Sequence, residues 1–140
     1  MQVAAVAHLT RNTELLDYCR TRFKTVLVPG QIEKDGSLPQ ELRRTKPYVY
    51  SLFNLEAFST IAQILSTPND NLWTFQTDDG RGLATAMKYM VPSIRDKRSF
   101  PKLSDVMYAE QWEQSAFCRP GFEGAGLRRI VAASAGGFDR

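Results

Sequence analysis

The sequence predicts an all-α fold of packed antiparallel helices. Apolar residues recur at helical spacing in several segments, and no segment alternates between apolar and polar residues as a half-buried strand does. Clusters of turn-forming residues separate the helical segments. With 43% apolar and 24% charged residues, the 140 residues have the composition and length of one globular domain.

The first two predicted helices lie in the N-terminal thirty residues. Residues 2–9 are predicted to be the end of an apolar helix. Asn12 or Thr13 can cap a second helix, which we expect to end at the sequence Val28-Pro29-Gly30. Its predicted apolar stripe consists of Leu15, Cys19, Phe23 and Val26, with Cys19 as a small core residue.

A third helix is predicted over residues 51–66, where apolar residues cover more than half of the circumference. So wide a face indicates a helix that packs on two sides. A short aromatic segment around Trp73 and a turn at residues 78–80 follow, and then a fourth helix over residues 82–91 that Pro92 should end. Residues 93–104 read as a basic loop, residues 104–114 as a helix, and the glycine-rich remainder as a frayed tail with one short helix at 127–133.

The polar segment between the second and third helices is the best candidate for a functional site. Asp35-Gly36-Ser37 and Pro39 are turn formers, so this segment should be irregular, and irregular segments on a helical scaffold often carry binding or chemistry. Arg44 and Tyr50 stand six residues apart within it. A permanently charged guanidinium beside a phenol suits a reaction on a substrate that carries a carboxylate.

Three runs in this region resemble the alginate lyase domain family of polysaccharide lyases: Asp35 to Leu42, Arg44-Thr45, and Tyr50 to Glu56. Leu72-Trp73-Thr74-Phe75 and Asp79-Gly80-Arg81 are also similar to the family, so the resemblance extends from Met1 to about Pro101. It implies a toroid of antiparallel helix pairs that cleaves uronate polysaccharides, of the alginate or glucuronan type, by β-elimination and usually without a metal. No cofactor is expected.

One motif of the family is absent. Members carry an Asn-Asn-His-Gly-type motif at the end of a preceding helix, and residues 2–7 look like the sequence that normally follows it. We therefore expect residues 1–101 to be the C-terminal part of the domain, an incomplete toroid, and residues 102–140 to be an extension.

The resemblance implies roles for two residues in particular. Arg44 would grip the uronate carboxylate and Tyr50 would remove the C5 proton and return a proton to the leaving oxygen. Positive charge beside a phenol favours its ionised form, which is the form that accepts a proton. The alginate-specific branch spaces its arginine and tyrosine by one residue more, so Arg43 is a second candidate for the carboxylate clamp.

Further residues are candidates for substrate binding. Tyr48 could stack on a sugar ring or cap the core, and Glu41 could bind sugar hydroxyls or pair with an arginine, which we favour. Gln31 and Asn54 both lie near the expected cleft, and for Asn54 we favour a buried structural amide. The only histidine, His8, lies on an apolar helix and is not expected to be catalytic.

Charge and targeting signals are weak. A net charge of +3 and a pI near 9.0 favour anionic partners, which fits a uronate polysaccharide, but neither nucleic acid nor a membrane is indicated. Asp78 and Asp79 read as a turn and not as a metal site, and Cys19 and Cys118 lack metal-binding spacing. Members of the family are typically exported, so a periplasmic or secreted parent is implied, although residues 1–9 lack the features of a signal peptide.

Two other functions stay open on the sequence alone. The absent Asn-His motif would also fit a noncatalytic or degenerate carbohydrate-binding remnant. The apolar faces that truncation exposes would also fit a helical module that associates with another chain.

Overall fold

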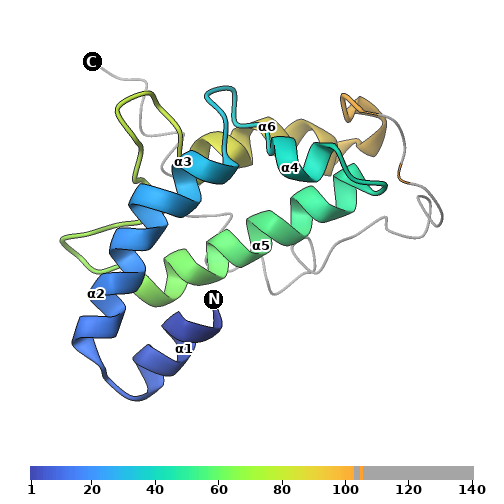
Figure 1. Cartoon of the computed structure of the whole chain (residues 1–140). Helices are drawn as coiled ribbons and strands as arrows, with labels where there is room; N and C mark the ends of the chain where they lie inside the picture. The colour runs from blue at the N-terminus through green and yellow to red at the C-terminus, as the bar shows by residue number, and fades with distance from the viewer. Residues whose placement is uncertain (103–104, 106–140) are drawn as a thin grey trace.

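The computed structural model describes residues 1–102 and 105, and within them the chain is helical, which confirms the predicted all-α fold (Figure 1). The only β pairing there is an isolated bridge between Thr67 and Asp70. The helices predicted at 104–114 and 127–133, and Cys118, lie outside the described residues. None of the helices in the described part is long and apolar enough to cross a membrane.

Helices α1 (Gln2–Leu9) and α2 (Thr13–Arg22) form a tight hairpin. Arg11 turns the chain between them with φ of 54°. Asn12 is the cap of α2, because its side-chain oxygen accepts a hydrogen bond from Leu15 N at 3.0 Å. The structure thus decides between the two predicted caps in favour of Asn12.

The prediction that Val28-Pro29-Gly30 ends the second helix is wrong. A π-helical turn, η1 (Phe23–Leu27), follows α2 directly and leads into α3 (Val28–Gln31), so the three form one continuous rod in Figure 1. Pro29 falls in the first turn of α3, where its missing N–H is tolerated, and the chain leaves the helix only at Ile32. The wider turn also changes the predicted stripe: Phe23 and Val28 are buried, Cys19 is half-buried at the edge of the core, and Val26 is exposed.

Helix α5 (Pro47–Leu65) crosses the middle of the molecule and contacts α1, α2, α4 (Pro39–Leu42) and α6 (Leu83–Arg95) (Figure 1). Contacts on several sides explain its wide apolar face, as predicted. Its start was predicted four residues too late, because Pro47 occupies the first helical position, which proline favours. Tyr50 therefore lies in the first turns of a helix and not in a loop.

Helix α6 (Leu83–Arg95) continues past Pro92, where the sequence predicted its end. Pro92 is exposed, and the buried face of the helix is carried by Leu83, Ala86, Met87 and Met90. Burial of this face stabilises the helical conformation across Pro92. The basic loop predicted for residues 93–104 is therefore partly helical, with a short 3-10 turn, η2 (Lys97–Ser99), after α6.

Helix α3 and the loop after it are attached to α6 and to the turn that precedes α6. Gly36 has φ of +85° and packs so closely on α6 that an added Cβ would lie 2.3 Å from Thr85 O. Arg81 Nη1 donates to Pro29 O at 3.0 Å, and Arg81 Nε pairs with Asp79 at 2.9 Å. Hydrogen bonds from Thr77 and then Arg81 hold the pKa of Asp79 below its ordinary value of 3.8. These contacts fix the path of the segment that leads to α4.

The N-terminus of α5 is capped by a residue that is distant in sequence. Pro47 has no N–H, Tyr50 N bonds to Lys46 O, and the two donors between them bond to the carboxylate of Asp105: Tyr48 N at 3.0 Å and Val49 N at 3.2 Å. Asp105 is only 5% exposed. A buried carboxylate on two backbone donors, at the positive end of the helix, stabilises the start of α5.

Asp105→Ala is expected to lower the free energy of unfolding by about 1–3 kcal/mol, because it leaves two buried backbone donors unpaired. Asp105→Asn keeps one acceptor oxygen and should cost less. Urea denaturation measures the change, with the exposed Asp78→Ala as the matched control. A loss no greater than that of the control would show that the cap contributes nothing to stability.

Candidate active site

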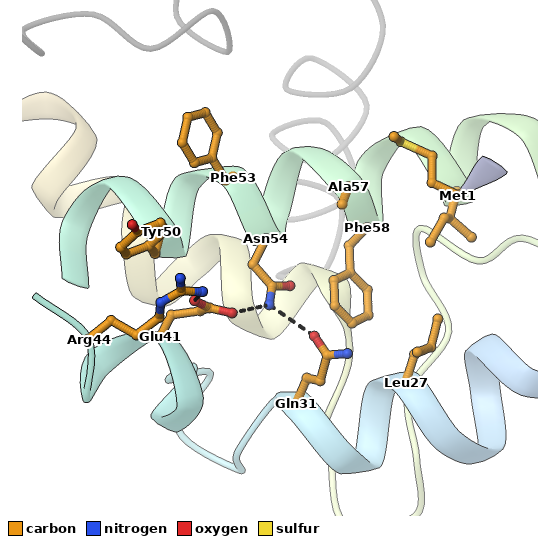
Figure 2. A pocket seen from close by; sticks show the side chains of 11 residues that line it. Met1, Leu27, Gln31, Glu41, Arg44, Tyr50, Phe53, Asn54, Ala57 and Phe58 are labelled. Atoms are coloured by element: carbon orange, nitrogen blue, oxygen red, sulfur yellow. Dashed lines mark hydrogen bonds and ion pairs between the residues drawn. The ribbon is translucent and has the colours of Figure 1, made fainter. Parts of the chain in front are cut away.

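A pocket of about 340 Å³ lies beside α5, between its first turns, α4 and the end of α3 (Figure 2). Its polar side is formed by Gln31 from α3, Glu41 from α4 and Arg44 from the following turn. Tyr50 and Asn54, one turn apart on α5, complete that side. Leu27, Phe58 and Ile61 supply the apolar remainder, with Met1, Phe53 and Ala57 at its edges.

Arg44 stacks on the ring of Tyr50, with its Cζ 3.7 Å from the ring centroid. This is a close cation–π contact, in which the flat guanidinium lies against the ring. Arg44 Nη1 also lies 3.5 Å from Glu41 Oε2, and the Arg44 side chain is 53% exposed. In a stacked guanidinium the N–H donors stay in the plane, so they can still bind a second, planar anion at the edge.

Asn54 joins the two loop segments of the site. Its Nδ2 donates to Gln31 Oε1 at 2.9 Å and to Glu41 Oε1 at 3.0 Å (Figure 2). Glu41 therefore accepts from Asn54 with one oxygen and faces Arg44 with the other. The result is a connected set of polar side chains from Gln31 to Tyr50 whose members orient one another.

Four of the six side chains proposed from the sequence line this pocket: Gln31, Glu41, Arg44 and Tyr50. Glu41 pairs with Arg44, which agrees with the interpretation favoured above. Arg43 is exposed and does not line the pocket, so the geometry favours Arg44 as the partner of Tyr50.

Tyr48 does not lie where a sugar-stacking residue would. It is 5% exposed, packs edge-to-face on Phe100 with 5.3 Å between ring centroids, and its hydroxyl donates to Ser93 O at 3.4 Å. Two residues along a helix differ by about 200°, so Tyr48 and Tyr50 face opposite sides of α5. Of the two interpretations given for Tyr48, its position agrees with a core residue.

Asn54 was the residue that the sequence interpretation undervalued. It is half-buried and lines the pocket, whereas its apolar neighbours suggested a purely structural amide. A signal was present in the spacing: Tyr50, Asn54, Phe58 and Ile61 recur every three or four residues and share one helix face. His8 is exposed on α1 and does not line the pocket. The described residues contain no group of three His, Cys, Asp or Glu side chains that could hold a metal ion.

Comparisons with known proteins point to one family. A family model described as alginate lyase matches residues 1–100. The crystal structure of an alginate lyase from Bacteroides ovatus is similar, with a TM-score of 0.73 and 28% sequence identity. The match covers 94% of this chain and 36% of that chain, so this chain spans about a third of the length of that structure. No curated protein matches.

Proposed function

The chain belongs to the alginate lyase family, as the match over residues 1–100 shows, and from this premise we propose that the pocket beside α5 is part of the active site of a polysaccharide lyase. The family implies a polysaccharide substrate. We propose that the substrate is an anionic uronate polysaccharide of the alginate or glucuronan type, met in the periplasm or outside the cell. The stack of Arg44 on Tyr50 is the observation that carries this proposal.

β-Elimination requires positive charge near the uronate carboxylate. The C5 proton is weakly acidic until the carboxylate is neutralised and the enolate that forms is stabilised. Arg44 is suited to this task because it is half-exposed and its edge donors are not covered by the ring of Tyr50. Its pairing with Glu41, at 3.5 Å on a partly exposed side chain, is weak enough for a substrate carboxylate to replace it.

The contact of Arg44 with the ring of Tyr50 supports a role for Tyr50 on the carbon next to a carboxylate that Arg44 would bind. In the proposed step the Tyr50 phenolate takes the C5 proton, the electron pair forms the C4–C5 double bond, and the C4–O bond breaks. The phenol formed in this way then gives its proton to the leaving oxygen. One sugar residue thus becomes unsaturated, the other ends in a hydroxyl group, and the tyrosine returns to its starting form.

The direct test is incubation of the protein with alginate and with glucuronan in parallel. Formation of the unsaturated uronate is followed by its ultraviolet absorbance, and binding is followed by isothermal titration calorimetry. Product from either polymer supports the lyase. Binding without product would favour the noncatalytic carbohydrate-binding alternative. Neither binding nor product would contradict both.

A second candidate function is association with another chain through α1. Val3, Val6 and Leu9 are 52%, 56% and 83% exposed, and Tyr18 on the adjacent α2 is 54% exposed. Exposed apolar side chains that gather on neighbouring helices are typical of interaction surfaces. This observation favours a helical interaction module, in which the pocket could retain its carbohydrate-binding role.

This candidate predicts that copies of the protein associate with one another as the protein concentration rises. Val6→Glu is expected to reduce association by at least about tenfold, because it places an unpaired charge in an apolar contact. Sedimentation velocity over a range of concentrations measures the effect. Gln63→Glu, which adds the same charge on an exposed position of α5, is the control. A monodisperse monomer at every concentration would contradict the candidate.

A further inference from the structure

We infer that Asn54 Oδ1 and Gln31 Nε2 form a recognition site for two neighbouring hydroxyl groups of a sugar residue, and that the Glu41 carboxylate fixes their orientation. The inference rests on the proposed function, which it deepens. All three side chains line the pocket that also contains Arg44 and Tyr50. The site would therefore recognise the arrangement of hydroxyl groups on the uronate whose carboxylate Arg44 binds, or on the adjacent sugar residue.

The orientation of the two amides follows from the chemistry of their partners. An ionised carboxylate only accepts hydrogen bonds, so the Asn54 atom 3.0 Å from Glu41 Oε1 must be the NH₂ group. The same nitrogen lies 2.9 Å from Gln31, so the Gln31 atom that meets it must be the carbonyl oxygen. One carboxylate thus sets the direction of Asn54, and Asn54 in turn sets the direction of Gln31.

Each amide is left with one group for a ligand. Within residues 1–102 and 105, neither Asn54 Oδ1 nor Gln31 Nε2 has a hydrogen-bond partner. Figure 2 shows both atoms on the side of the pocket where Phe58 lies. An acceptor and a donor next to each other complement a pair of hydroxyl groups, since one hydroxyl can donate to the acceptor while the other accepts from the donor.

The network is shielded enough for this orientation to persist. The Glu41 side chain is 15% exposed, and Asn54 and Gln31 are half-buried. Turning either amide over would bring two donors or two acceptors together and would break the hydrogen bonds that Asn54 makes to Gln31 and Glu41. The orientations of the Asn54 and Gln31 amides are therefore set by their hydrogen-bond partners.

Asn54→Asp tests the inference, because it replaces the donor that faces Glu41 with a second carboxylate. At about pH 7.5 the two carboxylates repel, Gln31 is free to turn its NH₂ group toward the introduced carboxylate, and the ligand loses its donor. Binding of an alginate or glucuronan tetrasaccharide should weaken about 10- to 100-fold.

Two further variants separate orientation from charge and from folding. Glu41→Gln removes a negative charge, which by itself would strengthen binding of a polyanion, yet it should weaken binding because the amides are no longer oriented. Asn69→Asp, in an exposed turn, makes the same change as Asn54→Asp away from the pocket and should bind as the wild type does. Circular dichroism checks that each variant is folded.

Calorimetry with the two tetrasaccharides gives distinct outcomes. Weaker binding by both Asn54→Asp and Glu41→Gln, with wild-type binding by Asn69→Asp, supports the inference. Wild-type affinity in Asn54→Asp at about pH 7.5, or tighter binding in Glu41→Gln, would overturn it while leaving the lyase proposal in place. Wild-type protein that binds neither tetrasaccharide would overturn the proposed function and this inference together.

Discussion

Tyr50→Phe is expected to lower turnover by about 10²-fold or more while substrate binding stays within a few-fold of wild type. The substitution removes only the hydroxyl group, so the ring on which Arg44 stacks remains. Under the proposed mechanism, the variant keeps Arg44 as the carboxylate clamp and loses the proposed proton-transfer group. The measurement is the rate of unsaturated uronate formation on alginate and glucuronan, together with calorimetric binding of the same polymers.

The chain offers a matched control for this experiment. Tyr18 also lies against an arginine, with Arg22 Cζ 5.9 Å from its ring centroid, but it does not line the pocket. Tyr18→Phe should therefore leave turnover unchanged. Near-wild-type product formation by Tyr50→Phe would eliminate Tyr50 as the proton-transfer residue.

Arg44→Lys is a companion variant that keeps the positive charge. It loses the planar group that lies over the Tyr50 ring and the two donors that would bind a carboxylate, so turnover should fall as well.

Gly36→Ala is expected to lower the free energy of unfolding by about 3–5 kcal/mol. Two costs add at this position. The backbone has φ of +85°, a conformation that alanine adopts only with strain, and the new Cβ would lie 2.3 Å from Thr85 O and 3.0 Å from Tyr89 Cβ. Moving the backbone of α6 would cost much free energy, so the loop that contains Gly36 must move instead.

Two other glycines separate these costs. Gly80 has φ of +87° but nothing within 4 Å of an added Cβ, so Gly80→Ala should show the conformational strain alone, about 1 kcal/mol. Gly30, in α3, has neither strain nor a close neighbour, so its substitution by alanine should be neutral or stabilising. Urea denaturation of the three variants tests this order. Equal losses for Gly36→Ala and Gly80→Ala would show that the approach to Thr85 is unimportant.

Much of the helical architecture could be predicted because it depends on local periodicity. The apolar spacing of residues 51–66 and the capping potential of Asn12 are properties of short segments, and the structure contains both. The helix boundaries were misplaced at prolines. Pro29 and Pro92 were predicted to end helices, although Pro29 occupies a first turn and Pro92 is tolerated inside α6. The start of α5 was predicted after Pro47, although proline is favourable at the first helical position.

The site was less predictable because it depends on contacts between distant residues. Arg44 and Tyr50 could be paired from a motif, but the choice between Arg43 and Arg44 required the turn after α4, which the sequence did not predict. The cap on α5 joins Asp105 to Tyr48 across 57 positions, and no local pattern signals such a contact. Asn54 bonds to Gln31 across 23 positions, so this hydrogen bond could not be predicted from a local pattern.

The π-helical turn η1 absorbs one residue without changing the face that α3 turns toward the site. A π turn holds about one residue more than an α-helical turn, so each of its residues adds less rotation than the roughly 100° of an α-helical residue. The five residues Phe23–Leu27 therefore rotate the chain by about as much as four α-helical residues would. Deleting a single residue from this turn would let the rod continue as a regular α-helix and would leave Gln31 facing Asn54. Among related sequences, a one-residue gap in this turn should therefore be compatible with the same polar lining of the pocket.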